Sequence, residues 1–125
     1  MVNKFTEFGG RILLGHIFLL AGISKITAYD GTMGYMDAMG VPGMLLPAVI
    51  LLEIAGGLMV IAGFKTRIAA AALAGFSIIA AVIFHSDLAD QMQMILFMKN
   101  LSIAGGLLLL VSYGAGSISI DKKLG

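Results

Sequence analysis

The amino-acid sequence predicts an all-α integral membrane protein, a four-helix bundle with a short interfacial helix between its first and second spans. Of the 125 residues, 59% are hydrophobic and only 12% are charged, which is too little polar surface for a soluble domain of this size. Several stretches approach the roughly 20 apolar residues that a helix needs to cross a bilayer. The formal net charge of +1 excludes the basic surface of a nucleic-acid-binding protein, and the absence of cysteine excludes disulfides and thiolate metal sites.

A single domain, residues 1–125, is expected to contain four spans near residues 9–26, 43–64, 67–86 and 92–113. The first span holds Arg11 and Lys25 near its ends, where long side chains can reach the polar interface. The second span is interrupted by Glu53, and the fourth contains Lys99. A cleaved signal peptide is the alternative interpretation of residues 1–26, but no clear cleavage site precedes a polar region there.

The segment between the first two spans, residues 27–42, is amphipathic. Asp30 is a candidate N-cap, methionines recur every three residues from Met33, and Gly40 with Pro42 ends the segment. These features predict a short helix at the membrane surface. Between the second and third spans, Lys65 and Thr66 are expected to form a tight turn.

The distribution of basic residues predicts the orientation of the chain. One side of the expected bundle holds six of them (Lys4, Arg11, Lys65, Arg67, Lys122 and Lys123), and the other side holds only Lys25 and Lys99. Because basic residues favour the cytoplasmic side, both termini are expected in the cytoplasm, in a multi-pass protein of the bacterial inner membrane.

Each span carries small or polar residues at helical spacing, which predicts the faces that pack inside the bundle. In the first span these are Arg11, Gly15, Phe18, Gly22 and Lys25. In the second they are Glu53, Gly56, Gly57, Val60 and Gly63. In the third they are Ala70, Ala74, Ser77, Ala81 and His85. In the fourth they are Lys99, Ser102, Gly106 and Tyr113.

Ionisable residues gather at one level in the outer half of the expected bundle. At 1.5 Å per residue, Lys25, Glu53 and Lys99 lie about 22, 16 and 21 Å from the inner ends of their spans, and the lysine side chains can bridge the difference. His85 and Asn100 lie at a similar or slightly outer depth. Placing an ionisable group within a membrane costs free energy. These residues are therefore expected to form either a functional cavity or a buried ion pair that fixes helix register.

No haem or metal site is predicted. His16 and His85 lie at different depths, about 9 and 27 Å above the inner ends of their spans, so they are not expected to share a haem. Seven methionines lie on the outer side, namely Met33, Met36, Met39, Met44, Met92, Met94 and Met98. Thioethers can bind Cu(I), but without a supporting histidine or cysteine an adaptable apolar lid is the favoured interpretation.

Several segments, in their order and spacing, resemble the DoxX family of small four-helix membrane proteins, and in particular its YqjF-like inner-membrane branch. The segments are RILLGHIFLLAGISK at 11–25, MGVP at 39–42, LLEIAGG at 51–57, GFKTR at 63–67, FHSD at 84–87, FMKN at 97–100 and SID at 119–121. The resemblance implies a membrane subunit of an oxidoreductase, with electrons passing through a bound quinone or a redox partner protein.

Two functions follow from these observations. In the first, a quinone or similar lipophilic molecule binds in the outer half, where Glu53 or His85 exchanges a proton. Lys25 or Lys99 then stabilises an anionic oxygen, and Asn100 contributes to ligand binding. In the second, the protein is a non-catalytic carrier of lipophilic molecules or an assembly partner of another membrane protein. The expected surroundings are the lipid bilayer, with a homo-oligomer or a partner protein as further associates.

Overall fold

The four predicted spans are four long helices, which confirms the expected fold class. The computed structural model describes residues 3–124, and its long helices are α1 (Lys4–Thr27), α3 (Leu46–Ala62), α4 (Thr66–Phe84) and α5 (Gln91–Tyr113). Each is long and apolar enough to cross a membrane, α3 together with the preceding 3₁₀ turn η1 (Gly43–Leu45). The first helix begins five residues before the expected start of the first span at residue 9, because the Asn3 side chain accepts a hydrogen bond from the Phe5 N–H at 2.7 Å and caps it.

The short helix α2 (Tyr29–Ala38) lies between α1 and η1, as the sequence predicts. Its N-cap is Ala28 rather than Asp30, which lies in the first turn instead. After α2 the chain turns through Gly40, whose φ of 85° is accessible to glycine at low cost. Asp37 then fixes the turn, since its side chain accepts a hydrogen bond from the Gly43 N–H at 2.7 Å.

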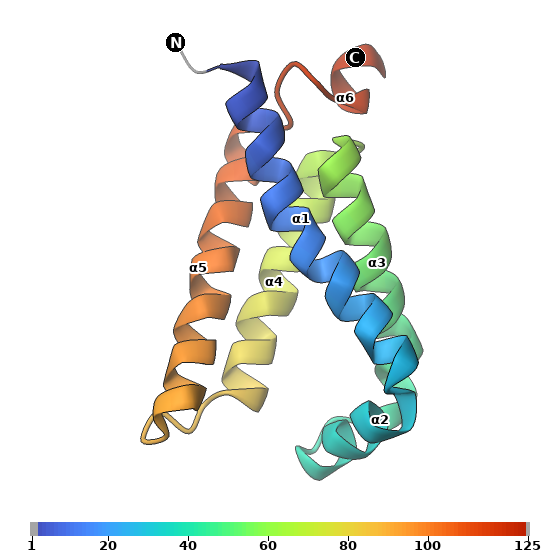
Figure 1. Cartoon of the computed structure of the whole chain (residues 1–125), viewed down its shortest axis with the longest axis vertical. Helices are drawn as coiled ribbons and strands as arrows, with labels where there is room; N and C mark the ends of the chain where they lie inside the picture. The colour runs from blue at the N-terminus through green and yellow to red at the C-terminus, as the bar shows by residue number, and fades with distance from the viewer. Residues whose placement is uncertain (1–2, 125) are drawn as a thin grey trace.

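The long helices form two pairs, α1 with α3 and α4 with α5, and the pairs meet chiefly where α3 packs on α4. Figure 1 shows the pairs close together at the end that carries both termini and spread apart at the end that carries α2. We call these the terminal end and the α2 end. The buried core lies between the pairs and consists of Phe18, Val60, Ala69, Ala70, Leu73, Ala74, Ala104 and Leu107.

Glycine allows α1 and α3 to cross at close range. A Cβ atom added to Gly57 would lie 2.8 Å from the carbonyl oxygen of Gly15 and 3.0 Å from the backbone nitrogen of Leu19. Because these are backbone atoms, the neighbouring helix could not move aside cheaply. The small residues of the first two predicted stripes therefore lie at a helix contact, as expected for packing within a membrane.

The predicted inward face of the fourth span is wrong except at Gly106, which lies against Leu14 of α1. Lys99, Ser102 and Tyr113 are exposed, and the buried residues of α5 are Ala104 and Leu107. A shift of one residue rotates an α-helical face by about 100°, so the polar stripe points away from the bundle. The helix packs on α4 largely through small and aliphatic side chains, and it presents Lys99 and Ser102 outward.

The C-terminal tail, residues 114–124, folds over the terminal end. The two carboxylate oxygens of Asp121 accept hydrogen bonds from the N–H groups of Lys65 at 2.6 Å and Thr66 at 2.9 Å, at the start of α4. Desolvation opposes ionisation of this carboxyl group, but these hydrogen bonds and the charge of Arg11 outweigh it and lower the pKa of Asp121. The short helix α6 (Ile120–Leu124) is held in place by this contact.

Arg11 joins α1 to the same tail. Its side chain is buried rather than extended to the polar interface, and its Nη2 donates a hydrogen bond to the carbonyl oxygen of Ile118. Gly63 makes room for this contact, since a Cβ atom there would collide with the side chains of Arg11 and Ser119. With a φ of 72°, Gly63 also ends α3 in the left-handed conformation.

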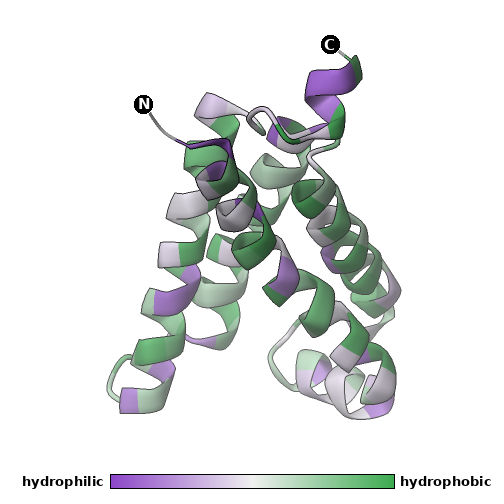
Figure 2. Cartoon of the chain, turned by 45° about the horizontal axis from the view of Figure 1, so that its top comes forward, coloured by the Kyte–Doolittle hydropathy of each residue, from purple (hydrophilic) through white to green (hydrophobic). Residues whose placement is uncertain are grey.

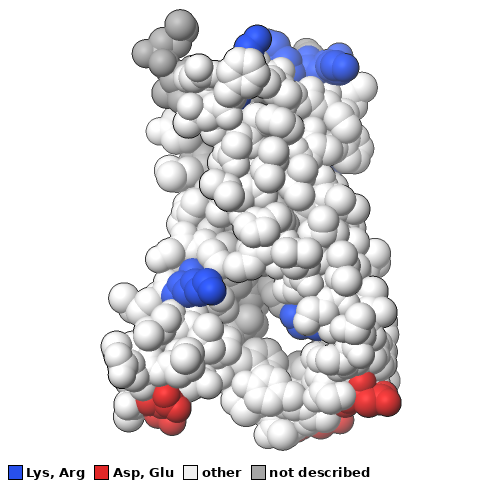
Figure 3. Space-filling view, in the orientation of Figure 1, with Lys and Arg blue, Asp and Glu red and all other residues white. Residues whose placement is uncertain are grey.

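The surface matches a protein that spans a bilayer. Figure 2 shows that the long helices consist mainly of hydrophobic residues. Figure 3 shows Lys and Arg gathered at the terminal end and Asp and Glu at the α2 end, with two Lys or Arg patches between them. The long helices thus expose apolar side chains such as Leu13, Leu51 and Ile68 where lipid is expected.

Candidate functional site

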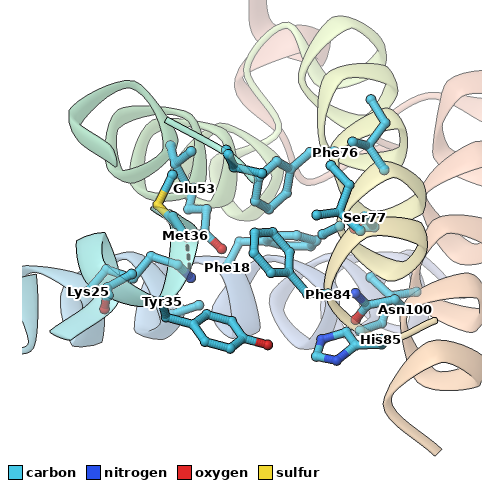
Figure 4. Close-up of a pocket in the computed structure, with 18 of the residues that line it drawn as sticks. Phe18, Lys25, Tyr35, Met36, Glu53, Phe76, Ser77, Phe84, His85 and Asn100 are labelled. Atoms are coloured by element: carbon cyan, nitrogen blue, oxygen red, sulfur yellow. Dashed lines mark ion pairs between the residues drawn. The ribbon is translucent and has the colours of Figure 1, made fainter. Parts of the chain in front are cut away.

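A pocket of about 460 Å³ lies between the two helix pairs in the half of the molecule that carries α2. Figure 4 shows side chains from α1, α2, α3 and α4 converging on it, and α5 contributes Asn100. Its walls are mainly apolar and aromatic. They are formed by Ile17, Phe18, Ala21, Tyr35, Met36, Val41, Val49, Phe76, Ile79, Ala80, Ile83, Phe84 and Ile103. The polar side chains that reach the pocket are Lys25, Thr32, Glu53, Ser77, His85 and Asn100.

An ion pair between α1 and α3 forms one side of the pocket. Lys25 Nζ lies 2.8 Å from Glu53 Oε1, and the Glu53 side chain is 4% exposed while that of Lys25 is 27% exposed. Gly22, one turn before Lys25, allows this approach, since a Cβ atom there would lie 3.3 Å from the Cβ of Glu53. The close crossing of the two helices therefore places an ammonium and a carboxylate together at the pocket wall.

His85 and Asn100 form the polar part of the opposite side. His85 ends α4, and its Nδ1 lies 3.0 Å from the side-chain oxygen of Gln93 on α5. Because an amide oxygen can only accept, Nδ1 carries the proton in this contact, which leaves Nε2 as the acceptor of the neutral ring. Figure 4 shows His85 and Asn100 beside each other, across the pocket from Lys25 and Glu53.

Lys99 is the predicted site residue that the structure does not bring to the pocket. It is exposed on α5 and does not line the cavity, whereas its neighbour Asn100 does. Counting depth along the helix predicts its level but not its direction. Two adjacent residues on a helix point about 100° apart, and here Asn100 faces the pocket while Lys99 points away from it.

An aromatic contact that the sequence analysis missed closes part of the pocket. The rings of Tyr35 on α2 and Phe84 on α4 are stacked, with centroids 5.4 Å apart and planes 25° apart. Thr32, Tyr35 and Met36 all line the pocket from α2. Their i, i+3, i+4 spacing marks one helix face and could have identified them.

Of the histidines and methionines discussed in the sequence, Met36 lines the pocket and His16 does not. His16 is exposed on α1, where its Nδ1 lies 2.6 Å from the carbonyl oxygen of Leu13, and it does not line the pocket. Met36 is buried and lines the pocket, so this part of the predicted apolar lid contacts the cavity. Five of the other outer methionines are exposed, namely Met39, Met44, Met92, Met94 and Met98.

Comparison with known proteins supports the resemblance seen in the sequence. A family model described as DoxX matches residues 7–86. The chain is 53% identical to inner membrane protein YqjF of Escherichia coli (strain K12) over 126 aligned residues, which cover 98% of this chain and 97% of that protein. It is 37% identical to inner membrane protein YphA of the same organism over 120 residues, which cover 90% and 86% of the two chains.

A shorter similarity extends to a protein of Bacillus subtilis (strain 168). The chain is 33% identical to the protein named "Putative oxidoreductase CatD" over 70 residues, which cover 54% of this chain and 52% of that one. No solved structure matches the chain.

Proposed function

The chain belongs to the DoxX family, and from that premise we propose that its pocket binds a lipophilic ring compound of the quinone class as part of a membrane redox system. The observation that carries the proposal is the pocket itself. Its walls are aromatic and aliphatic, and polar side chains face each other across it. A small-molecule site usually has this form. The name of the Bacillus subtilis relative supports a redox role.

The pocket residues fit a ring with oxygen atoms at its edges. Phe18, Phe76 and Phe84 offer apolar faces, while Lys25 and Asn100 offer hydrogen-bond donors on opposite sides. A bound quinone supplies the capacity to take up two electrons and two protons. This chain supplies no cysteine, so electrons are expected to come from a redox partner protein.

Glu53 and His85 have the chemistry to exchange protons with such a ligand. The Glu53 carboxylate is held by the Lys25 ammonium, with 2.8 Å between Nζ and Oε1. His85 is oriented by Gln93 through Nδ1, which leaves Nε2 to hold a proton or release it. Both residues line the same cavity and lie on different helix pairs, so they could exchange protons at two different edges of one bound ring.

Titration of the purified protein with a soluble short-chain quinone analogue tests the proposal. Saturable binding is expected, with affinity reduced about tenfold or more in Glu53→Gln, which removes the carboxylate charge, and in His85→Ala, which removes the imidazole. Lys99→Gln is the matched control, since this lysine lies outside the pocket. An absence of saturable binding, or an equal loss in the control, would overturn the proposal.

A second candidate function is assembly with another membrane protein. It is favoured by α5, which presents Lys99 and Ser102 on the exposed side of a predicted span. Polar groups facing lipid are costly, so a partner helix or a second copy of the chain would stabilise them. Mild detergent extraction followed by mass spectrometry separates the candidates. A bound quinone favours the first, and a stable partner without any small molecule favours the second.

The inner membrane is the proposed location, in agreement with the names of the two Escherichia coli relatives, and both termini are proposed to face the cytoplasm. The orientation is supported by the basic residues at the terminal end and the acidic residues at the α2 end (Figure 3). Cysteines introduced at Asp37 and Asp90 should react with an impermeant thiol reagent in cells whose inner membrane is intact and accessible to the reagent. A cysteine at Lys122 should stay unlabelled. The reverse labelling pattern would show that the protein has the opposite orientation in the membrane.

A further inference from the structure

A second cavity, of about 600 Å³, lies at the terminal end of the bundle, opposite to the pocket described above. The cavity is open at the surface, and three segments line it: the start of α4, the end of α5 and the C-terminal tail. The lining residues that matter for its chemistry are Lys65, Arg67, Ile68, Tyr113 and Lys122. We propose that this cavity binds the phosphate-bearing headgroup of an anionic lipid from the surrounding bilayer.

The first argument is charge. Lys65, Arg67 and Lys122 all line the cavity, and none of them forms an ion pair with another residue in the range 3–124. Lys65 does lie over the ring of Phe64, with its Nζ 5.8 Å from the ring centroid. An exposed cluster of three cations attracts anionic headgroups, and each cation near a membrane surface adds to the attraction.

Two carboxylates lie near these cations, but both have other partners. Asp121 lines the cavity, and its two oxygens accept the N–H groups of Lys65 and Thr66. Glu7 lies beside Gly116 at the edge of the cavity. Arg11 is buried close by and interacts electrostatically with both carboxylates, so its single charge offsets about half of theirs. The three cavity cations are therefore left with an excess of positive charge.

The second argument is the mixed character of the lining. Ile68 is 68% exposed and Tyr113 is 81% exposed, one at the start of α4 and the other at the end of α5. This is the level at which the two predicted spans end, and aromatic residues are typical of that interface. Apolar and cationic side chains thus adjoin at one depth. A lipid matches both, with its acyl chains along Ile68 and Tyr113, whereas a free phosphate ion would use only the cations.

The third argument is the position of Arg67. A Cβ atom on Gly114 would lie 3.2 Å from both Nε and Nη2 of Arg67, so the guanidinium lies directly against the end of α5. Gly114, with a φ of 78°, leaves the space for it. A guanidinium carries pairs of parallel N–H donors, which is the geometry that binds phosphate oxygens in pairs.

Native mass spectrometry of the full-length protein tests the proposal, with phosphatidylglycerol and phosphatidylcholine as probes. The wild type should retain phosphatidylglycerol in preference to phosphatidylcholine. Arg67→Gln and Lys122→Gln should each weaken retention about fivefold, which corresponds to the loss of one cation near a membrane surface. Lys4→Gln is the matched control, because it removes the same charge from the same end but lies outside the cavity.

Three outcomes would overturn the proposal. Equal retention of the two lipids would show that the cavity does not recognise the anionic headgroup. An equal loss in Lys4→Gln would show a diffuse effect of net charge rather than a site. Free phosphate would be identified as the ligand if millimolar inorganic phosphate displaced the lipid and stabilised the protein as much as the lipid does.

Discussion

At the terminal end of the bundle the two helix pairs lie close together, whereas at the α2 end they spread apart around a pocket of about 460 Å³. At the terminal end the tail folds over the bundle and lines the second cavity together with α4 and α5. At the α2 end, α2 reaches toward α4 through one aromatic stack. Within their pair, α1 and α3 approach closely through Gly15 and Gly57, about midway along α1, and again through Gly22 nearer to α2. The spread of the pairs and the path of the tail therefore decide where the pocket between the pairs lies.

The polar groups of the two ends differ in the same way. At the terminal end, Asp121 and Arg11 bind backbone groups of other segments, so their role is to hold the chain together. At the α2 end, Lys25, Glu53 and His85 line a space that no segment within residues 3–124 fills. A buried polar group that forms hydrogen bonds with the backbone has a structural role in the fold. A polar group that faces a cavity calls for a ligand, and that difference is the basis for assigning function to the α2 end.

The largest expected effect comes from the ion pair at the pocket. Glu53→Ala should lower the free energy of unfolding in detergent by about 3 kcal/mol, because it leaves the Lys25 ammonium without its partner. This is the lower end of the usual range for a broken buried pair, since Lys25 is partly exposed. Glu53→Gln should cost less, because its amide oxygen can still accept a hydrogen bond from Lys25.

Lys99→Ala provides the comparison for this prediction. This lysine lies on a long helix but is exposed and outside the pocket, so its loss should change stability by less than about 0.5 kcal/mol. If Glu53→Ala were as stable as the wild type, the α2 end would not depend on the ion pair. The contrast between the two ends would then rest on packing alone.

The next effect concerns the close crossing of α1 and α3 at Gly57. Gly57→Ala should destabilise the protein by about 1–3 kcal/mol, because the new methyl group would meet the backbone of α1. Gly105→Ala is the matched control, since a Cβ atom there has no neighbour within 4 Å and alanine favours the helix. Thermal unfolding of both variants in the same detergent measures the difference. Equal stability would mean that the two helices can separate at little cost.

The sequence was sufficient to predict the four spans and the inward faces of the first three. Those faces carry glycine, alanine and ionisable residues at helical spacing, which stand out against leucine and isoleucine. The inward face of α5 could not be found in this way, because Ala104 and Leu107 resemble the lipid-facing residues around them. On α5, as elsewhere in a membrane, both sides of the helix are apolar, and the polar stripe of this helix lies on its exposed side.

Contacts between distant segments were harder to predict. Depth counting could place Lys25 and Glu53 at neighbouring levels because the rise per residue of an α-helix is fixed. The contact of Asp121 with the start of α4 depends on the path of the tail, which no periodic pattern encodes. The position of α2 against Phe84 likewise depends on how the connecting turns fold, so the aromatic stack was missed.

A smaller effect is expected where the tail closes the terminal end. Asp121→Ala should cost about 1 kcal/mol, since the carboxylate caps the first turn of α4. Asp90→Ala is a suitable comparison because Asp90 caps α5 through the Met92 N–H at 3.0 Å, within its own segment. Both variants should lose similar stability, but only Asp121→Ala should make the tail sensitive to protease. Equal protease sensitivity would show that the cap does not hold the tail.

The same carboxylate gives this contribution a pH dependence. Because the pKa of Asp121 is lowered in the folded protein, its stabilising effect is complete above the ordinary aspartate pKa of about 3.9. The effect should be lost as the pH falls from that value through the lower folded pKa. The stability difference between wild type and Asp121→Asn should therefore shrink only below about pH 4. A difference that disappears nearer to neutral pH would point to another titrating group.

The smallest expected effect lies at the mouth of the pocket, where Tyr35 and Phe84 join α2 to α4. A double-mutant cycle with Tyr35→Leu and Phe84→Leu should give a coupling energy of about 0.5–1.5 kcal/mol, the usual value for a stacked aromatic pair. Pairing Tyr35→Leu with Leu109→Ala is the control, because Leu109 is exposed on α5 and the two changes should be additive. A coupling energy near zero would mean that the stack is open for much of the time in solution. The α2 end would then be less closed than the structure shows, and access of a ligand to the pocket would not require this contact to break.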